Sequence, residues 1–138
     1  PSYEEELQVV KATTAVQNIN LKNIVSSEEI LFFQNLIRKI PITDNVLEYA
    51  VGLVGKTRPG GPRATSEVNN YISWGAGPRA SQYLVLGAKC HAAINGKYSP
   101  DISDIQAISN YVLRHRIVRN YKAEAEGITE EDIIKGLL

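Results

Sequence analysis

The chain has 138 residues, of which 43% are hydrophobic and 22% are charged, a composition typical of one folded domain rather than of a disordered chain. Fifteen basic and fifteen acidic residues leave no formal net charge, so the positive excess of a non-specific nucleic-acid binder is missing. The one cysteine, Cys90, excludes an intramolecular disulfide, and no Cys/His cluster has zinc-ligand spacing. Because no apolar run reaches the roughly 18 residues of a membrane span and acidic residues follow Pro1, we expect a cytoplasmic protein without a membrane span.

The first half of the chain carries clear helix signals. Ser followed three residues later by Glu forms a capping box, which predicts helices over about 2–13 and 26–40. Thr43 caps a third helix. Its expected apolar face consists of Val46, Leu47, Ala50, Val51, Leu53 and Val54.

A sequence at the end of this third helix resembles a phosphate-binding P-loop. Residues 50–57 read AVGLVGKT, with Ala in place of the first Gly. That motif needs a strand before the loop and a helix beginning at the Lys-Thr pair. Here a helical pattern precedes the motif, and residues 57–70, TRPGGPRATSEVNN, predict a long exposed loop after it. We therefore reject a P-loop in this chain.

The second half alternates between extended segments and helices. Residues 71–74 are expected to be a short extended segment, and 78–94 a helix buried at the centre of the fold. Further helices are predicted over 101–109 and 129–135, while the weak alternation of 112–118 could form a strand beside 71–74. The expected fold class is all-α, a small helical bundle that could include a two-stranded β-ribbon.

Residues 74–80, WGAGPRA, carry the strongest functional signal. Gly75 and Gly77 bring bare backbone close to the start of a helix, and Pro78 occupies its first position. Unpaired amides at a helix N-terminus favour an anion, and a cation there, Arg79, is unfavourable by roughly 0.3–1 kcal/mol unless an anion is near. These four residues are the candidate phosphate or carboxylate site, and a surface arginine after an ordinary turn is the alternative. Trp74 is expected to pack against the turn.

Other polar residues have weaker functional interpretations. Arg58 could flank a nucleotide or compensate the dipole of the third helix. An extended segment would send the alternating Arg114, His115 and Arg116 to opposite faces, which argues against a nucleic-acid patch. His91 has no carboxylate or cysteine at ligand spacing, so we expect a packed histidine and no metal site.

Three segments together resemble one protein family. The run 71–80, YISWGAGPRA, looks like the sensor-2 motif of MoxR-type AAA+ ATPases. Residues 112–117, VLRHRI, with 123–127, AEAEG, resemble the C-terminal signature of the same proteins, and 1–6 resembles the segment after their ATPase core. The resemblance covers the whole chain, 1–138, as a C-terminal helical lid. It departs from the family at Gly77, where Ser is usual.

This resemblance implies a nucleotide-sensing role within a larger enzyme. The αβα core, with its Walker motifs, sensor 1 and arginine finger, is expected before Pro1, so the chain alone should neither bind a cofactor nor hydrolyse ATP. The parent would be a ring-forming ATPase, a hexamer, that uses ATP and Mg²⁺. In it Arg79, as the sensor-2 arginine, would reach the terminal phosphates beside Gly75, Gly77 and Pro78.

The implied partners are proteins. The lid would contact its own ATPase core and neighbouring ring subunits, in a chaperone-like factor that matures complexes, often with von Willebrand factor A-domain proteins. The alternative is a free-standing helical interaction module without ATPase activity, which would bind a partner through the loop 57–70 and the acidic ends of the chain and make Arg79 dispensable. A helix-turn-helix DNA binder is disfavoured because the helix 78–94 has only two bases, Arg79 and Lys89.

Overall fold

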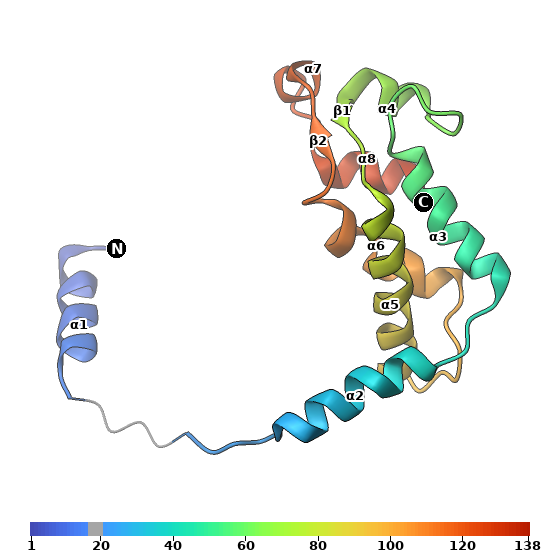
Figure 1. Ribbon diagram of the computed structural model, residues 1–138. Coiled ribbons are helices and arrows are strands. Elements are labelled where there is room, and N and C mark those ends of the chain that lie inside the picture. The colour runs from blue at the N-terminus through green and yellow to red at the C-terminus, as the bar shows by residue number, and fades with distance from the viewer. Residues whose placement is uncertain (17–20) are drawn as a thin grey trace. The chain divides into compact units, whose positions relative to one another are not determined.

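The computed structural model describes residues 1–16 and 21–138, which fall into two units, Pro1–Ile30 and Leu31–Leu138. The described residues form eight helices and one two-stranded antiparallel sheet (Figure 1). This confirms the all-α fold class and the β-ribbon. Within the described part of the chain, no helix has the length and apolar character needed to cross a membrane.

The elements follow the predicted order, with two additional short helices. The helices are α1 (Tyr3–Thr14), α2 (Ser27–Lys39), α3 (Asp44–Lys56), α4 (Ser66–Tyr71), α5 (Pro78–Ile94), α6 (Ile102–Leu113), α7 (Tyr121–Ala125) and α8 (Glu130–Leu137), and the strands are β1 (Ile72–Trp74) and β2 (Val118–Arg119). Both predicted capping boxes are present: Ser2 Oγ accepts from the Glu5 amide at 3.3 Å, and Ser26 Oγ from the Glu29 amide at 3.1 Å.

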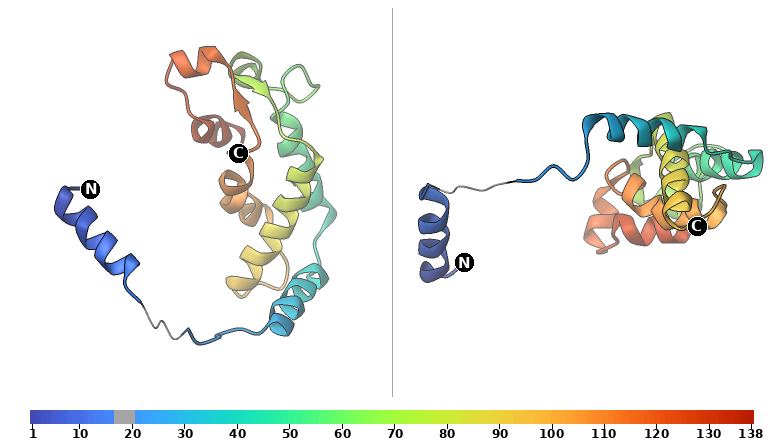
Figure 2. Two further views of the ribbon diagram at one scale, coloured as in Figure 1. Left: turned by 60° about the vertical axis from the view of Figure 1, so that its left-hand side comes forward. Right: turned by 90° about the horizontal axis from the view of Figure 1, so that it is seen from below.

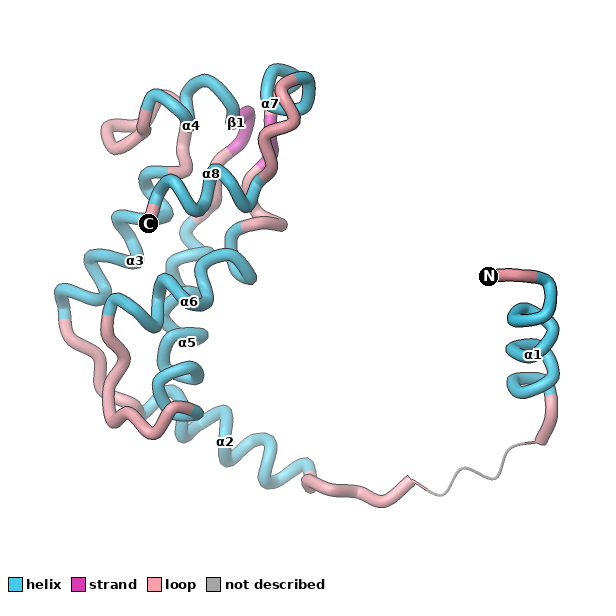
Figure 3. The backbone as a smooth tube through the Cα atoms, turned by 180° about the vertical axis from the view of Figure 1, so that it is seen from behind, coloured by secondary structure: helices cyan, strands magenta, loops and turns pink. Residues whose placement is uncertain are grey.

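The core of the second unit lies between α3, α5, α6 and α8. Helix α5 packs against both α3 and α6 (Figure 2), and α8 lies beside α6 (Figure 3). Gly87 permits the close approach of α5 to α6, since a Cβ there would lie 3.1 Å from Ile108 Cδ1. The largest fully buried apolar side chains are Leu53, Val54, Val68, Leu84, Ile105, Leu113, Ile133 and Ile134.

Two predicted helix faces are narrower than expected. Val51 is 60% exposed, because the core-facing positions of α3, at 46, 50, 53 and 54, leave it on the other side. On α5 the buried alanines and Leu84 recur every four residues, so only one stripe of this central helix faces the core. Ile94, at its end, is 85% exposed.

The strand predicted over 112–118 is wrong except at its end. Helix α6 continues to Leu113, which is fully buried, and residues 114–116 form a turn. Only Val118 and Arg119 join the ribbon, where Ile72 pairs with Arg119 and Trp74 with Val118 across an irregularity in the register. The alternation was misleading because the apolar residues at 112–113 complete the buried face of a helix.

The prediction of one exposed loop over 57–70 is also wrong. Thr57 is fully buried, and α4 begins within the segment, where the Thr65 side chain accepts a hydrogen bond from the Val68 amide. Asn120 caps the other unpredicted helix, α7, in the same way. Both short helices have a capping residue but too few turns for an apolar period to show.

Candidate functional site

The loop between β1 and α5 is fixed to the end of α3. Ala76, at its centre, is buried, and its amide donates to Thr57 Oγ1 at 3.0 Å. Its carbonyl oxygen accepts from Arg58 Nε at 2.9 Å, and Thr57 Oγ1 donates in turn to the Val54 carbonyl at 2.7 Å. Arg58 therefore supports this loop in the structure. The loop sets the position from which α5 begins.

The two glycines of the loop serve different purposes. A Cβ on Gly75 would lie 2.7 Å from Arg58 Cα and in contact with the Thr57 carbonyl oxygen, so this position requires glycine. A Cβ on Gly77 would meet no atom within 4 Å, and the backbone there is extended, with φ −84°. Gly77 is the N-cap of α5 and supplies no side-chain cap.

Arg79 lies in the first turn of α5, directly after Pro78, and its side chain is exposed. No described carboxylate lies within 4.0 Å of its guanidinium. Trp74 is 75% exposed, so the expectation that it packs against the turn is wrong. Buried Ala76 anchors the loop instead, which leaves the indole at the end of the ribbon facing outwards.

Two of the segments that resemble MoxR-type ATPases, 71–80 and 112–117, meet at one open pocket. The pocket has a volume of about 510 Å³. It is lined from the loop and α5 by Gly75, Gly77, Pro78 and Arg79, and from the turn after α6 by His115 and Arg116. The remaining lining residues are Trp74 and Ala80, so no acidic side chain is among them.

The prediction that residues 114–116 point to opposite faces is wrong for two of the three. Because these residues form a turn rather than a strand, His115 and Arg116 both line the pocket. Arg114 does not line it, and its guanidinium lies 3.9 Å from the Glu131 carboxylate. Spacing alone contained no signal for this convergence, although the resemblance had singled out both segments. The rejected P-loop lies within α3, as the helical pattern predicted.

Comparison with known proteins identifies the family. Residues 64–137, more than half of the chain, match the AAA lid domain. The chain belongs to the AAA lid domain family.

Two relatives and one solved structure match the whole chain or nearly all of it. The chain is 29% identical over its full length to Chaperone MoxR1 of Mycobacterium tuberculosis, and 27% identical to the uncharacterized protein YeaC of Bacillus subtilis. A crystal structure of a protein provisionally assigned as an ATPase, from Cytophaga hutchinsonii, matches 99% of the chain with 33% identity and a TM-score of 0.78. The chain spans 36%, 41% and 42% of these three proteins, respectively.

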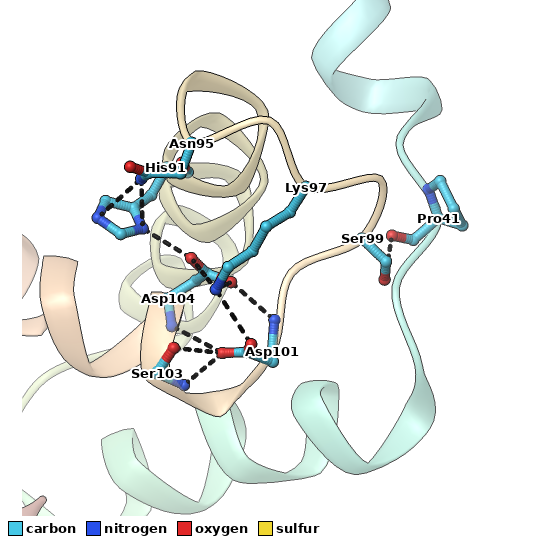
Figure 4. A network of polar contacts seen from close by, with 8 residues as sticks. All are labelled: Pro41, His91, Asn95, Lys97, Ser99, Asp101, Ser103 and Asp104. Atoms are coloured by element: carbon cyan, nitrogen blue, oxygen red, sulfur yellow. Dashed lines mark hydrogen bonds and ion pairs between the residues drawn. The ribbon is translucent and has the colours of Figure 1, made fainter.

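A second polar cluster of the lid domain lies where α5 ends and α6 begins (Figure 4). His91 Nδ1 lies 2.7 Å from Asp104 Oδ1, a carboxylate partner that the spacing around His91 did not indicate, and the His91 side chain is 38% exposed. Lys97 Nζ lies 3.0 Å from both Asp104 Oδ2 and Asp101 Oδ2, and the Asp101 amide donates to Asp104 Oδ2 at 2.8 Å. The partner was missed because it comes from the next helix, 13 residues further on.

Asp104 is fully buried in this cluster. Burial by itself raises the pKa of the Asp104 carboxyl, but hydrogen bonds from the Asp101 amide, His91 and Lys97 outweigh it and hold the pKa below its ordinary value. No group of three His, Cys, Asp or Glu side chains in the described ranges could hold a metal ion. The cluster therefore joins the end of α5 to the start of α6.

Proposed function

We propose that this lid domain is the nucleotide-sensing part of a ring-forming MoxR-like ATPase, with Arg79 as its sensor-2 arginine. The observation that carries the proposal is the exposed Arg79 guanidinium at the N-terminus of α5, in a pocket without an acidic side chain. A cation at this end of a helix is unfavourable unless an anion binds there. A terminal phosphate of ATP is an anion of the required kind.

The residues of the pocket fit a polyphosphate. A guanidinium presents a planar fork of donors that matches two phosphate oxygens and stays charged at any physiological pH. Gly77 adds no side chain in front of α5. Pro78 has no N–H and the Ala80 amide donates to the Gly77 carbonyl at 2.9 Å, so the Arg79 amide is the first-turn donor that could bind a ligand there. Ser, the usual family residue at position 77, would offer a hydroxyl contact to the ligand, and Gly77 does not.

Magnesium and the hydrolytic groups are proposed to lie elsewhere in the parent enzyme. The pocket lining includes no carboxylate, the ligand type that Mg²⁺ prefers. The chain spans 36–42% of its relatives' length, which supports a longer parent enzyme with room for an ATPase core. The core, neighbouring ring subunits and von Willebrand factor A-domain proteins are the proposed partners.

The upstream reading frame tests this arrangement directly. Sequencing about 200 codons before that of Pro1 should give a strand followed by G-x-x-x-x-G-K-[ST] and, later, an acidic Walker B run. A start codon immediately before Pro1 would instead indicate a free-standing relative without its own ATPase core.

Arg79→Ala in the complete ATPase tests the sensor role. We expect steady-state ATP turnover to fall on the order of 10²-fold, the typical effect of removing one group that stabilises transition-state charge. Arg114→Ala is the matched control, because Arg114 does not line the pocket, and its turnover should stay within about twofold. Unchanged turnover in Arg79→Ala, with intact folding, would refute the role.

One observation favours a second candidate, a helical protein-interaction module. Leu31, Phe32 and Phe33 on α2 are all more than half exposed, and aromatic side chains on a helix face can bind a partner protein. This candidate makes Arg79 dispensable for function. Phe32→Ser would then abolish partner binding while Arg79→Ala would not, whereas the lid proposal requires the loss of turnover in Arg79→Ala.

A further inference from the structure

We propose that Arg116 is a second phosphate-binding residue, which together with Arg79 binds a single polyphosphate anion in the pocket. The inference rests on the proposed function in taking a triphosphate as the ligand. It adds a residue from a different part of the chain, the turn between α6 and β2.

The geometry brings the two guanidinium groups to one side of α5. Arg79 and Tyr83 are four residues apart on this helix, so they lie on the same face one turn apart. The Arg116 guanidinium carbon lies 4.9 Å from the centroid of the Tyr83 ring, within cation–π range. Arg116 is thus held one helical turn from Arg79, and both residues line the pocket.

The backbone under Arg116 is also fixed. The Arg116 amide donates to the Leu113 carbonyl at 2.8 Å, and the Ile117 amide donates to the same oxygen at 3.2 Å. Leu113 and Ile117 are both buried, so the turn is anchored on either side of the arginine. A side chain restrained in this way loses less conformational entropy when it binds a ligand.

The charges of the pocket are unbalanced. Arg114 and Arg119, in the same stretch of chain, lie beside the carboxylates of Glu131 and Glu130. In the described ranges, neither Arg79 nor Arg116 has a carboxylate within 4.0 Å. Arg116 Nε is buried and has no hydrogen-bond partner among the described residues.

Two unpaired cations on one pocket favour a compact, multiply charged anion. Guanidinium groups bind phosphate oxygens bidentately, and a triphosphate offers oxygens to two such groups at once. An acidic peptide carries one negative charge per acidic residue, so it brings less charge between two neighbouring guanidinium groups than a triphosphate does. A polyphosphate is therefore the ligand class that the arrangement favours.

The first experiment titrates the wild-type 138-residue chain with inorganic tripolyphosphate at low ionic strength, followed by the Nε–Hε resonances of its arginines in ¹⁵N NMR spectra. We expect the resonances of Arg79 and Arg116 to shift along the same binding curve, with that of Arg114 unmoved. A titration in which Arg79 shifts and Arg116 does not would overturn the proposal without any variant. So would shifts produced by poly-glutamate but not by tripolyphosphate.

Variants then measure the contribution of Arg116. Arg116→Gln should weaken tripolyphosphate binding about tenfold, as expected on losing one charge-assisted pair of hydrogen bonds, whereas Arg114→Gln should change it less than about twofold. Equal weakening in both would indicate general attraction by positive charge and overturn the proposal. Tyr83→Ala should weaken binding severalfold while Tyr83→Phe retains it, because the ring and not the hydroxyl holds Arg116.

The same variants separate this inference from the proposed function. In the complete ATPase, Arg116→Gln should raise the KM for ATP at least as strongly as it lowers kcat. If tripolyphosphate binding depends on Arg116 but Arg79→Ala leaves ATP turnover unchanged, the anion site stands and the nucleotide-sensing function fails. If Arg79→Ala abolishes turnover but Arg116→Gln changes neither tripolyphosphate binding nor the KM, the function stands and this inference fails.

Discussion

The same substitution at two glycines of one loop should change stability in opposite directions. A Cβ introduced by Gly75→Ser would lie 2.7 Å from Arg58 Cα, whereas carbon atoms pack at about 3.5–4.0 Å, so the backbones must separate by about 1 Å. That shift would break the hydrogen bonds from the Ala76 amide to Thr57 Oγ1, at 3.0 Å, and from Arg58 Nε to the Ala76 carbonyl, at 2.9 Å.

The size of the effect follows from these contacts. Each of the two lost hydrogen bonds costs about 0.5–1.5 kcal/mol, and overpacking adds about 1–3 kcal/mol, so we expect Gly75→Ser to lower the free energy of unfolding by about 2–6 kcal/mol. Gly77→Ser meets no atom and gives α5 an N-cap hydroxyl, so it should raise the free energy of unfolding by a few tenths of a kcal/mol.

Urea denaturation followed by circular dichroism measures both changes in the 138-residue chain. The midpoint of Gly75→Ser should fall clearly, that of Gly77→Ser should rise slightly, and the slope of the transition should stay constant. Equal changes in the two serine variants would show that the close approach of this loop to the end of α3 does not determine the requirement for glycine.

Three further predictions concern buried polar groups. Asp104→Ala should lower the free energy of unfolding, measured by urea denaturation, by about 3 kcal/mol. The control is Asp132→Ala, because Asp132 has the same capping-box position in α8 but is exposed, and it should lower the free energy of unfolding by about 1 kcal/mol. Equal losses in the two variants would contradict the role of burial. Because the pKa of Asp104 is below its ordinary value of 3.8, its contribution is fully present above about pH 4 and is lost as the pH falls through the folded-state pKa. Asp104→Asn should therefore flatten the acid limb of a stability-against-pH curve, and an unchanged limb would argue against this sign. Thr57→Val leaves the buried Ala76 amide without its acceptor, so the thermal midpoint should drop by the equivalent of about 1–3 kcal/mol, and an unaltered midpoint would show that this bond contributes nothing.

Local signals in the sequence were sufficient for most of the fold. Capping boxes at Ser2 and Ser26, and Pro78 at the first position of α5, act within one helical turn, so they can be identified from neighbouring residues. The short helices α4 and α7 escaped prediction because a helix of one or two turns shows no apolar period.

Only the part of the candidate site that lies in residues 74–80 was predicted from the sequence. Residues 74–80 alone were enough to place Arg79 in the first turn of a helix that follows a glycine-rich turn. The packing of distant segments was needed to show that Thr57 fixes this turn, that Gly75 rather than Gly77 must be glycine, and that Arg116 lines the same pocket. These relations join residues 17 or more positions apart, and such contacts are set by how α3, α5 and α6 pack, which no local pattern of side chains records.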